Sequence, residues 1–297
     1  MEEIKWLHEA IELYKEGKSF LYIGKQLNVD RKKVSKVLNA NGYKTQYSFE
    51  EHNGIKREKK IWRKYQFNEN YFETIDTEEK AYWLGFLYAD GYVNSQKTSF
   101  ELRVKESDYS HLQKFLNCIE GNMPIRPTKK KIKNKIYLGW SIQVNSEKFK
   151  NDLIKQGCVE NKSLIIKFPT EEQVPNHLIH HFIRGYIDGD GSYVLKKNVY
   201  KGKKKTTVSY SISVEIAGTQ EFCEGYIKAL NLHKNKIHPL HKGITINSKR
   251  LLYSGPYGLQ IIHKLYDDAT IYLERKYKKI QQMFAVIGQD SQKTYDD

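Results

Sequence analysis

Residues 83–93, WLGFLYADGYV, and residues 183–193, IRGYIDGDGSY, are two copies of one short pattern. When the two are aligned, a glycine, an apolar pair, a small residue and the dipeptide Asp-Gly fall into register. The aligned carboxylates, Asp90 and Asp190, then lie one hundred positions apart. The chain therefore contains the same short helical motif twice, and each copy ends on an acid.

Small residues recur at four-residue intervals in both copies. They are Ala81, Gly85 and Ala89 in the first copy, and Gly185 and Gly189 in the second. This spacing clears a strip along one helix face, where another backbone can approach closely. If the two helices pack along these strips, their C-terminal ends come side by side. Gly91 and Gly191, just past the two ends, are the usual helix-terminating residue type.

Two carboxylates at adjoining helix ends are electrostatically unfavourable, because a helix C-terminus already carries about half a negative charge. A divalent cation would remove the conflict, and hard oxygen ligands suit Mg²⁺. Asp-Gly is also common turn chemistry, which would explain a single copy. Two copies on matched helices favour Asp90 and Asp190 as paired metal ligands. Such a pair matches the needs of phosphodiester hydrolysis, where a metal activates water and neutralises charge.

The sequence around each motif predicts a duplicated α+β unit. Alternating patterns indicate strands at 99–105, 136–144 and 208–216, and helical patterns occur near 107–119, 146–156, 219–231 and 256–268. The side chains expected on buried strand faces include Phe100, Leu102 and Val104, and then Ile136, Leu138, Trp140, Ile142 and Val144. Each half therefore reads helix, two strands, helix, two strands, helix.

Residues 1–43 predict a compact helical unit of their own. Ser19 and Asp30 are expected N-caps of the second and third helices, and the third helix carries Val34, Val37 and Leu38 on one side. The layout is that of a helix-turn-helix domain, and an ordinary three-helix bundle is the alternative. The residues expected to contact DNA are Arg31, Lys32, Ser35 and Lys36. Residues 44–72 form either a linker along a phosphate backbone or a spacer packed on the next domain.

The charge balance points to a polyanionic partner. Fifty Lys and Arg stand against thirty-five Asp and Glu, which gives a net charge of +15, and neutralised phosphates release counterions. Lysine runs at 129–135 and 196–205 read as loops between strands, with Lys129, Lys130, Lys131, Lys203, Lys204 and Lys205 as phosphate contacts. Polar strand residues suited to reading base edges in a major groove are Arg103, Lys105, Ser141, Gln143 and Asn145.

Other patterns exclude several classes of protein. No run of about 18 apolar residues predicts a membrane span, and the N-terminus lacks a secretory pattern. Cys118, Cys158 and Cys223 are too scattered for a disulfide framework, so we expect an intracellular, cytoplasmic protein. A zinc site at His177, His180 and His181 is not favoured, because a surface helix explains these histidines.

On the segments WLGFLYADG and IRGYIDGDG, residues 66–285 resemble the LAGLIDADG homing endonucleases in their single-chain, two-motif form. The surrounding sequence is similar to free-standing bacterial and phage members, whose genes are mobile genetic elements. The resemblance implies two αββαββα repeats in pseudo-twofold relation, here 73–170 and 171–285, followed by a tail at 286–297. It also implies that the antiparallel sheets form a saddle over DNA and that the motif helices form the repeat interface.

The resemblance also implies the site. Asp90 and Asp190 would bind the divalent metals, Mg²⁺ with Mn²⁺ as a substitute, helped by the backbone carbonyls of Ala89 and Gly189. A basic residue after the last helix of each repeat would lie near the scissile phosphates. Lys162 and Lys276 hold these positions, although Lys167, Arg275 and Lys278 lie nearby. Tyr88 in the first motif replaces the acid found at Asp188, which suggests asymmetry between the halves.

The expected activity is site-specific cleavage of both strands of duplex DNA at a long target by a monomer, leaving short 3′ single-stranded ends. Two alternatives share the fold that the resemblance implies. One is an RNA maturase, and the other is a catalytically silent DNA-binding regulator, which would also carry a helix-turn-helix. The presence of both aspartates favours the nuclease.

Overall fold

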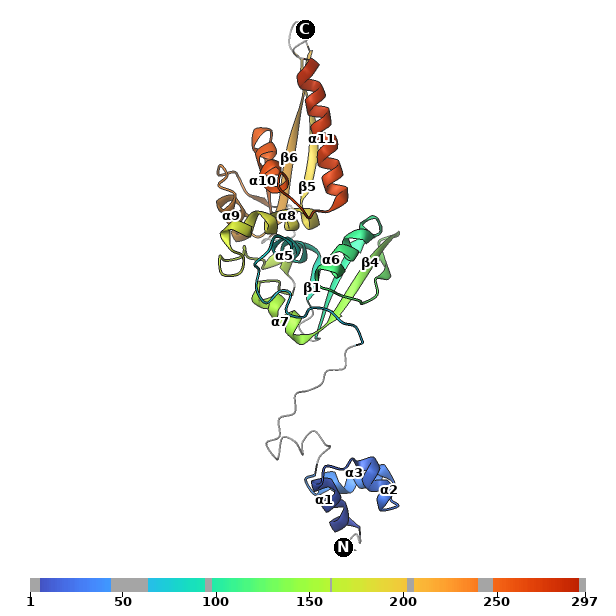
Figure 1. Cartoon of the computed structure of the whole chain (residues 1–297). Helices are drawn as coiled ribbons and strands as arrows, with labels where there is room; N and C mark the ends of the chain where they lie inside the picture. Colours follow the sequence, from blue (N-terminus) through green and yellow to red (C-terminus); the bar gives the residue numbers. More distant parts are fainter. Residues whose placement is uncertain are drawn as a thin grey trace. The chain divides into compact units, whose positions relative to one another are not determined.

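The computed structural model describes residues 6–43, 64–93, 98–160, 162–201, 206–239 and 248–293. The chain divides into two compact units, Met1–Arg63 and Lys64–Asp297. The first unit is helical, and the second contains two sheets with their helices (Figure 1).

The N-terminal unit contains three helices, α1 (Leu7–Lys15), α2 (Phe20–Gln26) and α3 (Arg31–Ala40). Its small core consists of Ala10, Tyr14, Ile23, Val34 and Leu38. The two predicted N-caps are confirmed, since Ser19 accepts from the Tyr22 backbone N–H at 3.2 Å and Asp30 accepts from that of Lys32 at 2.8 Å. The caps satisfy backbone donors that a helix start leaves without an intrahelical partner.

The second unit is built from two repeats with the same order of elements, as predicted. The first runs α5 (Glu78–Asp90), β1 (Gly91–Val93), β2 (Ser99–Lys105), α6 (Tyr109–Cys118), β3 (Arg126–Ile132), β4 (Lys135–Asn145) and α7 (Glu147–Lys155). The second runs α8 (Ile179–Asp190), β5 (Ser192–Lys201), β6 (Thr206–Gly218), α9 (Gln220–Ala229), β7 (His238–Pro239), β8 (Lys249–Ser254) and α10 (Pro256–Tyr266). Both are αββαββα, so the predicted α+β class is confirmed.

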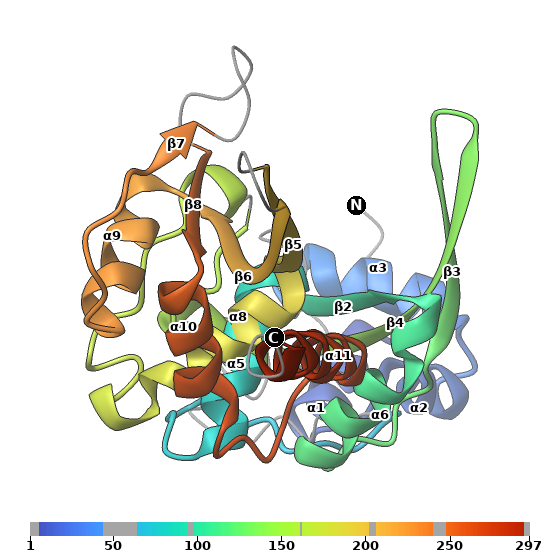
Figure 2. The same ribbon diagram turned by 90° about the horizontal axis from the view of Figure 1, so that it is seen from above.

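The two sheets are antiparallel and have equivalent strand orders, β1-β2-β4-β3 and β5-β6-β8-β7. They lie on either side of the helix pair α5 and α8 (Figure 2). One face of each sheet packs on helices and carries the alternating apolar residues, such as Phe100 and Leu102 in β2 and Ile212 and Val214 in β6. We call the opposite face of each sheet its outward face.

The motif helices α5 and α8 pack backbone against backbone. A Cβ placed on Gly85 would lie 1.9 Å from the Phe182 carbonyl oxygen, and one on Gly185 would lie 1.9 Å from that of Tyr82. Phe182 precedes Gly185 by three residues, just as Tyr82 precedes Gly85. The contact is therefore reciprocal, as expected of a pseudo-twofold interface. Only glycine permits this approach, so the predicted strip of small residues is the contact surface itself.

Two details of the strand prediction are wrong. Lys129, Lys130 and Lys131 lie on β3, and Lys196 and Lys197 lie on β5, so these parts of the lysine runs are strands and not loops. Ile136 and Leu138, expected in the core, are 66% and 47% exposed. The hairpin of β3 and β4 projects beyond the helices (Figure 2). Both of its faces therefore meet solvent, where lysine and apolar side chains are equally tolerated and alternation carries no information about burial.

Residues 64–72 belong to the second unit. The Asn68 backbone N–H donates to the Ile119 carbonyl at 2.7 Å, and that of Asn122 donates to the Gln66 carbonyl at 3.1 Å. Tyr71 and Phe72 are buried in the core of this unit. Of the two alternatives for the segment 44–72, packing on the second unit holds for its described part, and residues 44–63 lie outside the described residues.

The last helix, α11 (Glu274–Lys293), extends past position 285 into the segment expected as a tail. Its buried side chains Ile280 and Met283 join the core of the second unit. Across the described ranges, no helix is both long enough and apolar enough to span a membrane.

Candidate active site at the ends of the motif helices

The packing of α5 on α8 brings the two aspartates to one place. A Cβ on Gly189 would lie 2.3 Å from the Ala89 Cβ and 3.5 Å from Oδ2 of Asp90. The end of α8 is therefore in direct contact with the end of α5, where Asp90 lies. Asp190 follows Gly189 at once, so the two carboxylates share the same end of the helix pair.

Gly91 and Gly191 end the two helices, but their conformation differs from the usual glycine cap. Their φ values are −71° and −79°, so neither is in the left-handed region. A Cβ on Gly91 would lie 2.6 Å from the Leu87 carbonyl oxygen, and one on Gly191 would lie 2.5 Å from Cγ2 of Ile187. Glycine is needed at both positions because the strand that follows each helix leaves it so sharply that a Cβ would meet the last helical turn.

The surroundings of the two carboxylates disfavour their negative charge. Both aspartates are accessible at the surface, yet many protein atoms around them displace water. This burial, together with the charge of Asp190, raises the pKa of Asp90 to about 7, although Lys162 and Lys276 act in the opposite direction. Burial also raises the pKa of Asp190, against the same two lysines. A bound cation would favour the ionised form of both groups.

Lys276 and Lys162 occupy equivalent positions in the two halves. Nζ of Lys276 donates to the carbonyl oxygens of Ile187 at 2.5 Å and Gly191 at 2.7 Å. Nζ of Lys162 donates to the carbonyl oxygen of Gly91. Each lysine thus bonds to the glycine that follows the aspartate of its own repeat. Lys276 is only 6% exposed, and this burial lowers its pKa to about 8.

The other basic residues near these positions point elsewhere. The guanidinium of Arg275 pairs with Asp108 at 3.1 Å. Lys167 is 74% exposed at its side chain and lies 3.8 Å from Glu221, and Lys278 is exposed on α11. The geometry therefore places Lys162 and Lys276, and not these three neighbours, beside the aspartates.

The motif position that differs between the repeats has an equivalent task in both. Asp188 is fully buried and accepts from the hydroxyls of Tyr82 and Tyr266, at 2.9 and 2.6 Å, and from the Leu273 backbone N–H at 2.7 Å. The Tyr88 hydroxyl donates to the Gln156 carbonyl at 2.5 Å. Each side chain thus anchors the chain that follows the last helix of its repeat, which is the part that leads to the lysine.

The residues at the helix ends fit a hard divalent cation. In the described part of the chain, no three His, Cys, Asp or Glu side chains form a cluster able to hold a metal. The ligands from the protein would be the carboxylates of Asp90 and Asp190 and the carbonyls of Ala89 and Gly189. This all-oxygen set, completed by water or substrate oxygens, is typical of Mg²⁺ sites and too small for a closed structural site.

The outward face of the first sheet carries the polar residues predicted to contact DNA. Arg103, Lys105, Gln143 and Asn145 are exposed there. Ser141 is opposite both Arg103 and Arg126 in the strand register, but its side chain is largely covered, at 7% exposed. Arg103 is held by two bonds of 2.7 Å from its guanidinium to Glu101, which orients it on this face.

The predicted lysines fall into three groups. Lys130 is opposite Tyr137 and lies on the outward face of the first sheet. Lys129 and Lys131 are opposite Leu138 and Ile136, on the other face of the projecting hairpin. Lys203, Lys204 and Lys205 lie outside the described residues. On α3, Arg31, Lys32 and Lys36 are exposed, while Ser35 is half-buried and accepts from the Asn39 side chain at 3.2 Å.

The outward face of the second sheet was not assigned from the sequence. Its residues include Lys196 and Asn198 in β5, Ser209, Ser211 and Ser213 in β6, and Arg250 in β8. The alternation in 208–216 contains this information, because the serines occupy the positions between the buried apolar residues. The same period-two argument that selected Ser141 and Gln143 would have found them.

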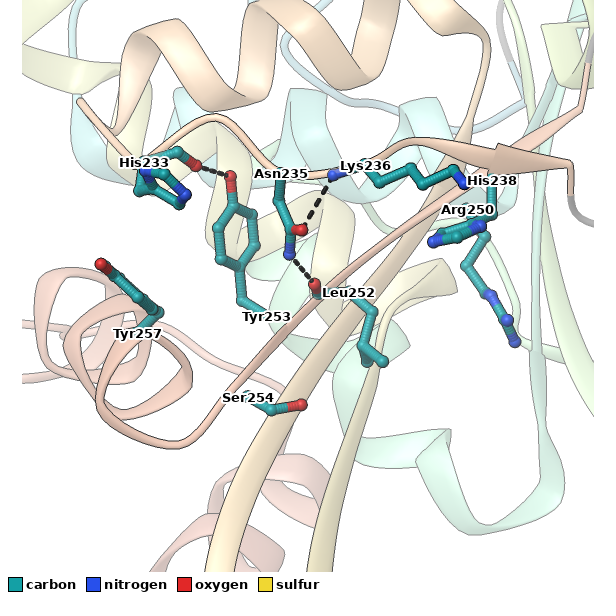
Figure 3. A pocket seen from close by; sticks show the side chains of 9 residues that line it. All are labelled: His233, Asn235, Lys236, His238, Arg250, Leu252, Tyr253, Ser254 and Tyr257. Carbon is teal, nitrogen blue, oxygen red and sulfur yellow. Dashed lines mark hydrogen bonds between the residues drawn. The ribbon is translucent and has the colours of Figure 1, made fainter.

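A basic pocket at the edge of β8 was also missed. It has a volume of about 420 Å³ and is lined in part by His233, Lys236, His238, Arg250 and Tyr257 (Figure 3). Its wall is fixed by the bonds from Tyr253 to the His233 carbonyl and from Asn235 to the Leu252 carbonyl, both 2.6 Å. No sequence pattern indicates the pocket, because it forms between a strand and an irregular segment.

Comparison with known proteins gives matches among solved structures only. No family model matches the chain, and no curated protein matches it. The chain is similar to I-LtrWI bound to target DNA, with 12% identity over 76% of this chain and 92% of that chain and a TM-score of 0.47. It is similar to I-SmaMI bound to cleaved DNA, with 16% identity over 75% and 92% and a TM-score of 0.44. It is also similar to I-CpaMI bound to uncleaved DNA, with 14% identity over 74% of this chain and 93% of that chain and a TM-score of 0.44.

These structures are LAGLIDADG endonucleases. They belong to the family that the two motifs of this chain resemble.

Proposed function

We propose that the chain is a site-specific endonuclease that cuts both strands of duplex DNA with a divalent metal. Mg²⁺ is the expected cofactor, and Mn²⁺ is expected to substitute. The observation that carries the proposal is the convergence of Asp90 and Asp190 at adjoining helix ends, each beside a lysine held by the neighbouring glycine carbonyl. Two scissile phosphates need two such sets, and the two repeats supply one each.

A divalent metal held by Asp90, Asp190 and the carbonyls of Ala89 and Gly189 would supply an activated water and charge neutralisation at the phosphate. The chain's own residues have separate tasks around it. The carboxylates hold and orient the cation, and the ammonium groups of Lys162 and Lys276 offset negative charge that develops on the phosphate. Their carbonyl partners fix each ammonium beside its own aspartate.

Binding of DNA is assigned to the outward faces of the sheets and to the exposed basic face of α3. The net charge of +15 supports a polyanionic partner. Since one chain carries both halves of the site, we propose that it acts as a monomer on a long target. Short 3′ single-stranded ends are the products that the family resemblance implies.

The second candidate is a catalytically silent DNA-binding regulator. An RNA maturase, which binds RNA instead, is the other alternative on the same fold. The helical unit at residues 1–43 favours the regulator, because a basic helix after a tight turn adds binding without any need for chemistry. The two lysines beside the two aspartates favour the nuclease, since binding alone gives no reason to assemble these groups.

The test is incubation of the protein with a large pool of random and host-derived duplex DNA in Mg²⁺, followed by sequencing of the new ends. Discrete paired ends made by the wild type, and absent with Asp190→Asn, would establish the endonuclease and give its site and overhang together. Selective retention of a DNA or RNA subset without any cut would transfer the proposal to the regulator or the maturase.

Replacing Lys162 or Lys276 by methionine is expected to slow cleavage at saturating enzyme by about 100-fold, with DNA affinity nearly unchanged. Methionine keeps an unbranched apolar side chain, one heavy atom shorter, and removes the charge that faces the acids. Single-turnover rates and a binding titration in Ca²⁺ separate the two effects. Lys167→Met is the matched control and is expected to cut at the wild-type rate. Wild-type rates in both test variants would remove these lysines from the site.

A further inference from the structure

The segment that carries Lys276 belongs to the second repeat but is held by both repeats: in the second, Arg184 donates to the Ile271 carbonyl at 2.9 Å and Asp188 accepts from the Leu273 backbone N–H at 2.7 Å. The Thr270 backbone N–H donates to Glu78 at 2.9 Å. The Lys114 side chain donates to Glu274 at 2.7 Å, and Arg275 pairs with Asp108 at 3.1 Å. Glu78, Lys114 and Asp108 all belong to the first repeat, so three contacts cross the repeat interface just before Lys276.

The contact between Asp108 and Arg275 is the most constrained of the three. Asp108 is 5% exposed, and both of its carboxylate oxygens accept from the Arg275 guanidinium at 3.1–3.3 Å. A buried carboxylate is costly without a partner, so Asp108 holds the guanidinium in one place. Arg275 directly precedes Lys276, and its guanidinium is engaged by Asp108. Its fixed position restricts the backbone from which the Lys276 side chain reaches the helix end.

The segment that carries Lys162, in the first repeat, is held by a hydrogen bond from the second repeat. The Thr219 hydroxyl, in the second repeat, donates to the Ile166 carbonyl at 2.6 Å. The Ile166 backbone N–H in turn donates to the Lys162 carbonyl at 2.7 Å. Thr219 precedes α9 just as Asp108 precedes α6. Each lysine segment is therefore tied to the other repeat at the turn between the second strand and the following helix.

On the basis of the proposed function, we propose that Asp108 and Arg275 are positioning residues for Lys276, and that Thr219 has the same task for Lys162. Each half of the site is then completed by the opposite repeat, so that neither lysine is placed unless the two repeats are correctly docked. One contact is an ion pair and the other is a neutral hydrogen bond, and each acts on one lysine only. Because each lysine serves one scissile phosphate, breaking one contact should slow the cleavage of one DNA strand and leave that of the other intact.

The first experiment measures lysine reactivity and needs no cleavage. The full-length protein is treated briefly with an amine-reactive acetylating reagent, and acetylation at each lysine is quantified by mass spectrometry. Arg275→Gln and Asp108→Asn are both expected to raise the labelling rate of Lys276 about tenfold and to leave Lys162 unchanged. Thr219→Val is expected to raise the labelling rate of Lys162 and to leave that of Lys276 unchanged. Unchanged labelling of Lys276 in both charge variants would overturn the proposal.

The second experiment follows each strand of the target found in the DNA pool, with different end labels, under single-turnover conditions. Arg275→Gln is expected to slow one strand about tenfold, so that nicked duplex accumulates, and Thr219→Val to slow the other strand. Arg275→Lys keeps the charge but not the paired geometry. Its rate on the affected strand is expected to lie between those of the wild type and Arg275→Gln. Equal slowing of both strands would contradict a local positioning role.

Unfolding curves of every variant separate positioning from loss of the fold. If Arg275→Gln does not fold, Arg275→Lys and Asp108→Asn decide the labelling outcome. A wild-type protein that does not cut any DNA would refute the proposed function, whereas the labelling experiment would still decide whether the ion pair places Lys276.

Discussion

Asp90→Asn and Asp190→Asn are each expected to abolish cleavage, by about 10³-fold or more, while DNA binding survives. Asparagine preserves the size and shape of the side chain but removes the negative charge that holds a divalent cation. Removing one charge of the pair also relieves the mutual repulsion, which adds to burial in raising the pKa of Asp90. The variants are therefore expected to be folded and at least as stable as the wild type.

The measurement is a single-turnover cleavage rate in Mg²⁺ beside a binding titration on the same duplex. Asp267→Asn is a matched control, because Asp267 follows α10 directly, is 67% exposed at its side chain and pairs with His263 at 2.9 Å. The control is expected to cut at the wild-type rate. Loss of binding together with cutting would indicate that the two acids have a structural role, and cutting by Asp190→Asn would remove it from the metal site.

Gly85→Ala is expected to be the most destabilising single-methyl substitution in the interface of the motif helices, with Gly185→Ala as its equivalent. The added Cβ would lie 1.9 Å from a backbone carbonyl oxygen of the partner helix, where ordinary contacts are 3.4 Å or more. A backbone in the centre of a packed helix pair cannot rotate away as a side chain can, so the helices must separate. Overpacking of a core usually costs 1–3 kcal/mol, and we expect about 3 kcal/mol or more here.

Chemical unfolding followed by circular dichroism tests this expectation. Gly288→Ala is the matched control, because Gly288 is exposed in α11 and a Cβ there would meet nothing within 4 Å. At such a site alanine is expected to increase stability by about 0.5–1 kcal/mol through its helix propensity. An unfolding midpoint for Gly85→Ala equal to that of the wild type would refute the close approach of the two helices. Separation of the helix ends would also impair cleavage in any folded fraction.

Much of the second unit is predictable from sequence, because its signals are local and repeated. The alternation of Phe100, Leu102 and Val104 locates β2, since burial of one strand face imposes a period of two. The small residues spaced four apart around Gly85 and Gly185 predict the helix contact, because they leave room for another backbone on one helix face. The prediction failed for Ile136 and Leu138, where the hairpin leaves the core and its side chains no longer have a buried face.

The partners of Lys162 and Lys276 are a different case. The family resemblance indicated Lys162 and Lys276, but Lys167, Arg275 and Lys278 lie close to them along the chain and made that choice less secure. The structure distinguishes them because the Lys276 side chain reaches the Gly191 carbonyl, whereas the Arg275 side chain pairs with Asp108. Those partners are separated from Lys276 by 85 and more residues in the chain, so no local pattern could distinguish them.

The sequence by itself determined the duplication, the motif helices, the strand faces and the two aspartates at the helix ends, because each follows from periodicity or residue type within a short window. Only the tertiary structure decided which basic side chains lie beside the aspartates, where the pocket beside β8 forms, and how each lysine segment is bonded to the opposite repeat. These contacts join residues from both halves of the chain. They exist only once the two repeats have packed along their glycines.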